Sequence, residues 1–281
     1  ILFMNLASRK KHGAFAKIVK AELELKNSGN STYLSHQLTP HPFHITVPFN
    51  YEGDPPDLVT LYMQSSSGGL YDKDCQELDV TLYRGSKLHL TSQASTIVHH
   101  ARNEVGAKCL FNFNLSDDTT LEYLPDPVIL MAGSKFSAIS TINLKPNCQA
   151  LMSEAFITHD PSNSGQIFDT CYSETQIFLD SELVVNEKFY VCGADYFSRI
   201  DGYSCFASIY LYGYSFAVIR KIKDALAALP EAYSGCSYFK ENKLAIFKVL
   251  AQRSSSLLRI TESTWALARE DMTGQVPKRR R

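Results

Sequence analysis

Hydrophobic and polar residues alternate along the chain from about Thr32 to Val191, with the period of two that is typical of half-buried β-strands. Three segments repeat one pattern: an alternating run reaches a short polar turn, and the alternation then resumes. They are residues 77–95, 108–125 and 137–157, with turns at 84–86, 116–118 and 146–147. We interpret each segment as a β-hairpin. Because the turns recur at intervals of about thirty residues, we expect stacked units that wind into a layered or helical β architecture.

The pattern changes after about Tyr203. Residues 215–229 place apolar side chains three and four positions apart, which predicts an amphipathic helix ended by Pro230. Residues 243–252 predict a short apolar strand. Residues 254–271 predict a second helix that opens with serines able to cap it. One face of this helix aligns Leu258, Thr261, Trp265 and Ala268.

The predicted fold class is therefore mainly β: a helically wound or layered β-sheet body with a small C-terminal α/β portion that contains two helices. We expect residues 1–202 to form the β-rich body. Residues 203–281 are expected to form a helix–strand–helix portion packed on it. Gly202 marks the seam, within one folded unit rather than at a flexible linker.

Composition narrows the class of partner. The chain has 281 residues and a net charge of −1, which argues against nucleic acid as the main partner, because phosphate binding needs a basic field. The basic run 278–281 reads as a solvated tail. The most apolar stretch, residues 208–219, is shorter than the roughly 18 residues that span a bilayer, so no membrane association is expected.

The N-terminus and the cysteines both favour a cytoplasmic protein. The first twelve residues place hydrophobic residues before charges, the reverse of a secretory signal, and Met4 is a candidate start. Seven cysteines lie far apart, with no C-x-x-C pair. This odd, scattered set indicates reduced buried thiols rather than a disulfide framework or a zinc site.

The residues offer no detectable active site. The segment SSGGLYDKDCQELDV (66–80) lacks the spacing of a phosphate-binding loop, and Asp72 and Asp74 lack the further ligands of a calcium loop. The histidine pairs 41/44 and 99/100 have neither helical spacing nor matching partners, so ordinary hydrogen-bonded histidines are expected. Neither a G-x-S-x-G nor an H-E-x-x-H motif is present. The composition and motifs therefore favour a binding or scaffolding protein without enzymatic activity.

Five segments, in order, resemble the UreD family of urease accessory proteins, called UreH in some organisms. Residues 31–49 resemble the opening of that family, and residues 66–80 resemble its Gly-Gly-Val/Leu-x-Gly-Gly-Asp motif. Residues 90–100 and 121–136 resemble two further motifs, and the tail from residue 235 also fits, so the resemblance covers about residues 13–277. The matching positions are Gly68, Gly69, Asp74, Leu90, Thr91, Gln93, Thr96, Leu121, Glu122, Leu124, Pro125, Ile129, Gly133, Trp265, Arg269, Gly274 and Pro277.

The chain departs from the family pattern at several positions. The family's second Gly-Gly is Asp72–Lys73 here, and its motif lysine is Ile97. The Gly-Arg that usually follows the family's glutamate, Glu154 in this chain, is missing, although Gly165 is a candidate match for the next Gly-Glu. The closing motif has become PKRRR. The sequence thus resembles a divergent member.

The resemblance implies a non-enzymatic maturation role. Proteins of this kind bind apo-urease and join UreF and the GTPase UreG, and the assembly delivers nickel to the urease active site, with GTP held by the UreG-like partner. An internal passage is implied for nickel in transit, with no stably bound cofactor. Asp74, Thr96 and Glu154 match positions whose polar groups could line it, with Glu122 as a fourth candidate. Carboxylate and hydroxyl oxygens bind a divalent cation weakly enough to release it.

Three alternatives remain open on the sequence. The carboxylates of Asp74 and Glu122 could simply pair with nearby donors in the β body. The chain could be a scaffold of the same fold that serves another partner and has no urease role. A hydrolase with a dispersed active site is a third reading, although nothing in the sequence requires it. A dimeric assembly formed through the partner is also compatible with the resemblance.

Overall fold

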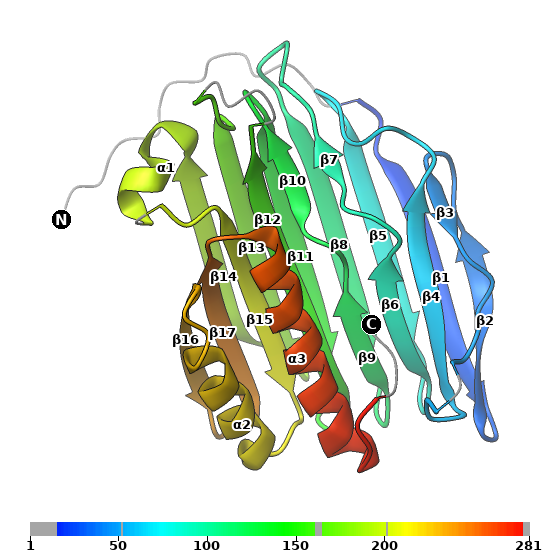
Figure 1. The fold of residues 1–281 in the computed structure, drawn as a ribbon. Helices are drawn as coiled ribbons and strands as arrows, with labels where there is room; N and C mark the ends of the chain where they lie inside the picture. Colours follow the sequence, from blue (N-terminus) through cyan, green and yellow to red (C-terminus); the bar gives the residue numbers. More distant parts are fainter. Residues whose placement is uncertain (1–15, 52, 161–164, 201, 278–281) are drawn as a thin grey trace.

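The computed structural model describes residues 16–51, 53–160, 165–200 and 202–277. The candidate start at Met4 and the basic run 278–281 lie outside these residues. Two β-sheets face each other and enclose the main core, and two helices cover the outer face of the second sheet (Figure 1).

The first sheet has seven strands in the order β14-β13-β11-β8-β5-β1-β2. Its four inner pairings, from β1/β5 to β11/β13, are parallel, whereas β1/β2 and β13/β14 are antiparallel. The strands are β1 (Val19–Ser28), β2 (Ser31–Leu38), β5 (Cys75–Leu82), β8 (Ala107–Leu115), β11 (Lys135–Leu144), β13 (Thr170–Leu179) and β14 (Glu182–Cys192).

The second sheet has ten strands, eight of them in the order β16-β17-β15-β12-β9-β6-β4-β3. The short strands β7 and β10 pair with each other and, through β10, with the last residues of β12. The strands are β3 (Phe43–Ile45), β4 (Leu58–Ser65), β6 (Lys87–Ser92), β7 (Ile97–Val98), β9 (Thr120–Leu124), β10 (Val128–Met131), β12 (Gln149–His159), β15 (Cys205–Tyr212), β16 (Ala232–Phe239) and β17 (Leu244–Ala251).

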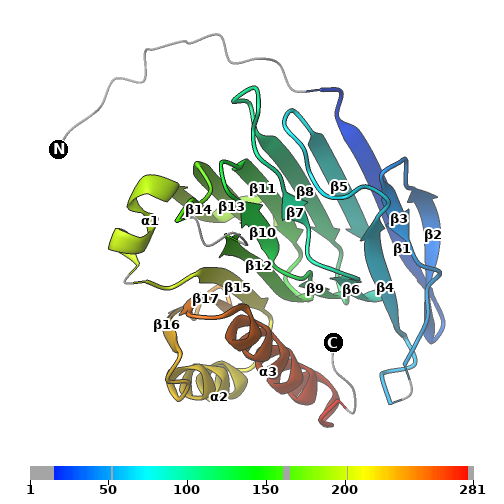
Figure 2. The ribbon, with the colours of Figure 1, turned by 45° about the horizontal axis from the view of Figure 1, so that its top comes forward.

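The chain winds from one sheet to the other, so the predicted helically wound β body is confirmed (Figure 2). The hairpin interpretation of the three repeated segments is wrong. β5 pairs in parallel with β1 and β8, and β6 with β4 and β9, so the turn between β5 and β6 carries the chain from the first sheet to the second. The segments 108–125 and 137–157 cross between the sheets in the same way. A corner and a hairpin need the same Gly, Asp, Asn and Pro residues, so local sequence does not separate them.

The core between the sheets follows from the alternation. Leu78, Val80 and Leu82 of β5 are at most 1% exposed, and they share one cluster with Leu88 and Leu90 of β6. The apolar residues of each alternating run therefore point inward from both sheets, and the polar residues between them face outward. A smaller cluster around Val98, Leu130 and Phe156 fills the interior beside β7 and β10.

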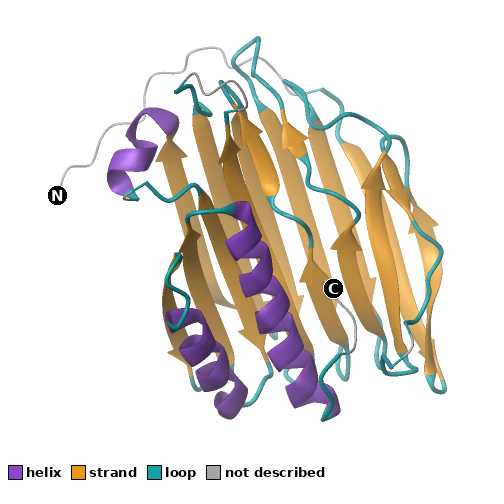
Figure 3. Cartoon of the chain, in the orientation of Figure 1, coloured by secondary structure: helices purple, strands orange, loops and turns teal. Residues whose placement is uncertain are grey.

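Both predicted C-terminal helices are present, as α2 (Phe216–Ala227) and α3 (Ser254–Thr273), and a short helix α1 (Gly193–Arg199) was not predicted (Figure 3). Ser215 caps α2 by accepting a hydrogen bond from the Val218 N–H. The predicted serine cap of α3 is wrong, because Arg253 occupies that position with no side-chain cap. No helix in the described part of the chain is long and apolar enough to cross a membrane.

The C-terminal strands extend the second sheet. β15 pairs with β12, and β17 lies between β15 and β16. Thr261, Trp265 and Ala268 of α3 are buried as the helical face predicts, while Leu258 is half-buried beside the buried Leu257. All seven cysteines are free, and five of them are buried.

Candidate functional site

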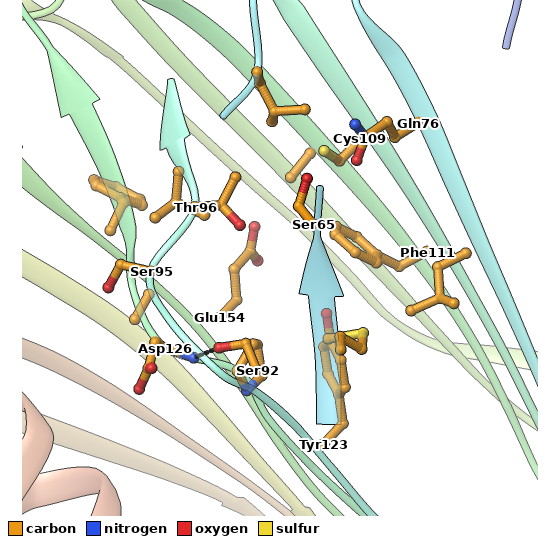
Figure 4. Close-up of a pocket in the computed structure, with 18 of the residues that line it drawn as sticks. Ser65, Gln76, Ser92, Ser95, Thr96, Cys109, Phe111, Tyr123, Asp126 and Glu154 are labelled. Atoms are coloured by element: carbon orange, nitrogen blue, oxygen red, sulfur yellow. Dashed lines mark hydrogen bonds between the residues drawn. The ribbon is translucent and has the colours of Figure 1, made fainter. Parts of the chain in front are cut away.

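A cavity of about 390 Å³ lies inside the wound body, between the two sheets and beside the short strand β7. Side chains from both sheets line it, including Gln76, Cys109 and Phe111 from the first and Tyr123 and Glu154 from the second (Figure 4). The segments 67–70, 93–96 and 125–126 supply further parts of the wall. The winding of the chain therefore brings residues that are far apart in sequence to the wall of one cavity.

Glu154 is a buried carboxylate in the wall of this cavity, which also includes Glu77 and Asp126. It shares the inward face of β12 with Met152 and Phe156, both of which are buried in the interior clusters. Its Oε2 accepts hydrogen bonds from Ser173 Oγ at 2.7 Å and from Thr175 Oγ1 at 3.5 Å, both on β13 of the facing sheet. Burial raises the pKa of Glu154, and these hydroxyl groups and the charge of a nearby lysine oppose that rise.

Hydroxyl groups make up much of the polar lining around Glu154. Thr96 and Ser95 come from the loop before β7, and Ser65 comes from the end of β4. Figure 4 shows the Thr96 hydroxyl and the Glu154 carboxylate turned into the same cavity. Burial raises the pKa of the lining thiol Cys109 to about 12, so at neutral pH it is a thiol rather than a thiolate ligand. The polar groups around Glu154 are therefore mainly hydroxyl oxygens, within a wall that is otherwise largely apolar.

Asp74 lies elsewhere. It is absent from the cavity wall, and its Oδ2 accepts a hydrogen bond from the Tyr71 N–H at 2.8 Å while its own N–H donates to the Tyr71 carbonyl. The Asp74 carboxylate therefore holds its own turn, outside this cavity. Asp72 accepts hydrogen bonds from the Asn103 and Gly106 N–H groups, both at 2.7 Å. Both aspartates therefore stabilise loops by accepting backbone hydrogen bonds, a role that the local sequence does not reveal.

The glycines of the matching motifs occupy positions that a side chain would obstruct. Gly69 has a φ of +132°, and a Cβ there would lie 2.3 Å from the Ile97 carbonyl oxygen. The two backbones are this close because the Leu70 N–H donates a hydrogen bond to the Ile97 carbonyl. A Cβ at Gly133, which has a φ of +67°, would lie 2.0 Å from His100 Nδ1. Lys73 adopts a φ of +75° at a position where the resemblance expects glycine.

The other matched motif residues divide between the cavity and the outer face of the second sheet. Gly68, Gly69, Gln93 and Pro125 line the cavity. Thr91 is buried and donates a hydrogen bond from Oγ1 to the Leu124 carbonyl at 2.7 Å, and Leu124 belongs to the core beneath the helices.

Glu122 forms a buried cluster on the outer face of the second sheet rather than in the cavity. Its carboxylate contacts His89 Nδ1 at 2.7 Å and accepts hydrogen bonds from Trp265 Nε1 at 2.8 Å and from Arg269 Nε at 2.7 Å. Arg269 also pairs with Asp54 at 2.8 Å. Burial opposes ionisation of Glu122, but Arg269 and His89 outweigh it and lower its pKa to about 2.

The structure thus brings Thr96 and Glu154 together and leaves Asp74 and Glu122 in other roles. The described residues contain no group of three or more His, Cys, Asp or Glu side chains that could hold a metal ion. Of the histidine pairs, His99 contacts the Gly68 carbonyl through Nε2 at 2.9 Å and stacks on Tyr71.

Sequence reasoning missed a half-buried charged residue on the inner face of the second sheet, Lys248. It stands inside the apolar strand β17 (LAIFKVLA), and that single charge was the available signal. Its ammonium donates a hydrogen bond to Ser208 Oγ at 2.6 Å and forms an ion pair with Glu187. Burial lowers the pKa of Lys248 to about 8, and the Glu154 carboxylate opposes that shift.

The chain is similar in sequence to known proteins. The family model for the UreD urease accessory protein matches residues 19–281. A urease accessory protein UreD 1 from Methylorubrum populi is 29% identical over 273 residues, which cover 94% of this chain and 91% of that protein. The UreD 1 of Methylorubrum extorquens is 38% identical over 151 residues, or 54% of this chain and 51% of that protein. A UreD 1 from Pseudomonas syringae pv. syringae is 26% identical over 264 residues, covering 91% and 92% of the two chains. The chain therefore belongs to the UreD urease accessory protein family.

Proposed function

We propose that this protein is a non-enzymatic scaffold for urease maturation in the cytoplasm, and that it binds apo-urease together with UreF-like and UreG-like partners. Family membership over residues 19–281 supports the maturation role. In this proposal nickel is cargo that passes through the protein, and any GTP is bound by the UreG-like partner.

The observation that carries the nickel proposal is the position of Glu154 beside hydroxyl groups in the internal cavity. A buried carboxylate with surrounding hydroxyl groups suits a cation that must be taken up and then released, because oxygen ligands hold a nickel ion less tightly than thiolate or imidazole ligands do. Thr96 lies on the same cavity wall, so it is the second residue proposed to meet the ion. Asp74 and Glu122 are left out of this route, because their carboxylates are engaged elsewhere.

The maturation role is tested by co-expression with the urease genes and the other accessory proteins. The protein is expected to co-purify with a UreF-like partner and apo-urease, and to restore urease activity in a strain that lacks its own UreD. Recovery of free protein alone, with all partners present, would contradict the role. Soluble expression without restored urease activity would instead favour a scaffold of the same fold that serves another partner.

The role of Glu154 is tested by Glu154→Gln, which keeps the side-chain shape and removes the charge. We expect the complexes to form normally and the nickel content of the matured urease, measured by elemental analysis, to fall. The matched control is Glu174→Gln on β13, because Glu174 pairs with Lys188 and Tyr172 and does not line the cavity. Equal nickel content in both variants would remove Glu154 from the proposed route.

A further inference from the structure

A polar row crosses the inner face of the second sheet from the cavity towards the end of the wound body. Glu154 on β12 is in register with Ser208 on β15, and Ser208 is in register with Lys248 on β17. Adjacent strands lie about 4.8 Å apart, so the row runs roughly 10 Å across the sheet. Carboxylate, hydroxyl and ammonium groups thus follow one another in a line.

The ammonium of Lys248 lies among aromatic rings. It is 5.4 Å from the ring centroid of Phe206 and 5.8 Å from that of Tyr210, the residues two positions before and after Ser208 on β15. Phe206 in turn stacks on Phe156 at 5.1 Å and on Phe189 at 4.5 Å. The walls beside the ammonium are therefore largely apolar, which strengthens electrostatic effects along the row.

The facing sheet completes the charge pattern. Glu187 on β14, which is in register with Thr175 on β13, pairs with Lys248. Thr175 itself donates a hydrogen bond to Glu154. Lys248 is therefore placed between two carboxylates, Glu154 on the side of the cavity and Glu187 at the end of the body.

A second cavity, of about 290 Å³, lies on the far side of this row. Its wall includes Phe189, Tyr196, Phe206, Tyr233 and Lys248. It is near the end of the body, where β14 and β16 are the last strands of the two sheets (Figure 2). Glu154 lines the first cavity and Lys248 lines the second. The lysine thus lies between the carboxylate of the first cavity and the wall of the second, along the polar row.

We propose that Lys248 is a built-in cation that competes with a divalent metal ion for Glu154 and so controls passage between the two cavities. The inference rests on the proposed nickel route. A tethered ammonium near Glu154 repels an arriving cation and makes its binding weaker and more easily reversed. Ser208 and Glu187 hold the ammonium while the ion occupies Glu154. Lys248 is thus a positioning and specificity residue rather than a metal ligand.

The test measures binding of Ni²⁺ to the purified full-length chain by isothermal titration calorimetry, without urease or partners. Lys248→Met is expected to bind Ni²⁺ on the order of tenfold more tightly at the interior site, because one repelling charge is lost. Lys248→Arg keeps the charge and is expected to bind as the unchanged protein does. Lys188→Met is the matched control, since Lys188 is an exposed lysine on the neighbouring β14 that pairs with Glu174. The gain in affinity is expected to vanish in the double variant Glu154→Gln/Lys248→Met.

Affinity unchanged in Lys248→Met would overturn the proposal, and so would a gain that persists in the double variant or an absence of Ni²⁺ binding in all variants. Lys248→Gln, which retains a donor for Ser208, is measured alongside in case the methionine variant fails to fold. This experiment is independent of the maturation role. A protein that restores urease activity but shows no effect of Lys248 loses only this inference, whereas the expected Ni²⁺ affinities without restored urease would count against the maturation role alone.

Discussion

Arg269 of α3 donates two hydrogen bonds to the carboxylate of Glu122 on β9, at 2.7 Å from Nε to Oε1 and 2.5 Å from Nη2 to Oε2. Both side chains are at most 2% exposed. Trp265, one turn earlier on α3, donates to the same carboxylate. The pair joins residues 147 positions apart and holds α3 against the second sheet. The cluster therefore attaches the C-terminal helix to the β body.

Replacing Glu122 by Gln is expected to destabilise the protein by about 3–5 kcal/mol, because the Arg269 guanidinium then stays buried without its main counter-charge. Urea unfolding followed by circular dichroism measures the free energy. Glu174→Gln serves as the control, since Glu174 pairs with the exposed Lys188 and such pairs contribute about 1 kcal/mol or less. A Glu122→Gln protein as stable as this control would show that the cluster does not hold α3.

The same cluster predicts a dependence of stability on acid. The pKa of Glu122 is about 2 in the folded protein, below its ordinary 4.5, so its ionised form is the one that stabilises the fold. This contribution is complete above about pH 4.5 and is lost as the pH falls towards 2. Its full size is on the order of 3 kcal/mol.

The groups around Glu122 are His89, Trp265, Arg269 and Tyr214, and Asp54 pairs with Arg269 beside them. Urea midpoints measured between pH 5 and pH 3 are expected to fall more steeply for the unchanged protein than for Glu122→Gln, which has no carboxyl to protonate. Parallel slopes for the two proteins would assign the acid sensitivity to other carboxylates.

The sequence predicted the strands and turns but not how the strands pair. Alternation around residues 84–86 marks two strands whether they pair with each other or belong to opposite sheets. The parallel partners β5 and β8 are joined through a strand of the other sheet, and no local signal reports such a pairing. The two C-terminal helices were predictable because a period near 3.6 is a property of one segment alone.

The candidate site was predictable only in part, for the same reason. Thr96 and Glu154 reach the cavity because their motifs lie on strands and loops that turn inward. Glu122 has the same residue type, yet its partners His89 and Arg269 come from distant elements and give it a different role. Lys248 was missed because Ser208 and Glu187 become its neighbours only when β15, β17 and β14 assemble.

Glu154→Gln is expected to raise the stability of the protein at neutral pH, unlike most changes of a buried polar residue. Burial raises the pKa of Glu154, so its ionised form is the unfavourable one in the folded state. The stability that the group contributes is present at low pH and is lost as the pH rises above the ordinary carboxyl pKa. Melting temperatures are therefore expected to be higher for Glu154→Gln than for the unchanged protein at pH 7.5, with the difference shrinking towards pH 4.

The control is Glu174→Gln. A hydrogen bond from Tyr172 lowers the pKa of Glu174, so this variant is expected to melt below the unchanged protein at pH 7.5. A Glu154→Gln protein that melts below the unchanged protein at pH 7.5 would mean that the carboxylate is held by its neighbours for stability, which would weaken its assignment as a binding group.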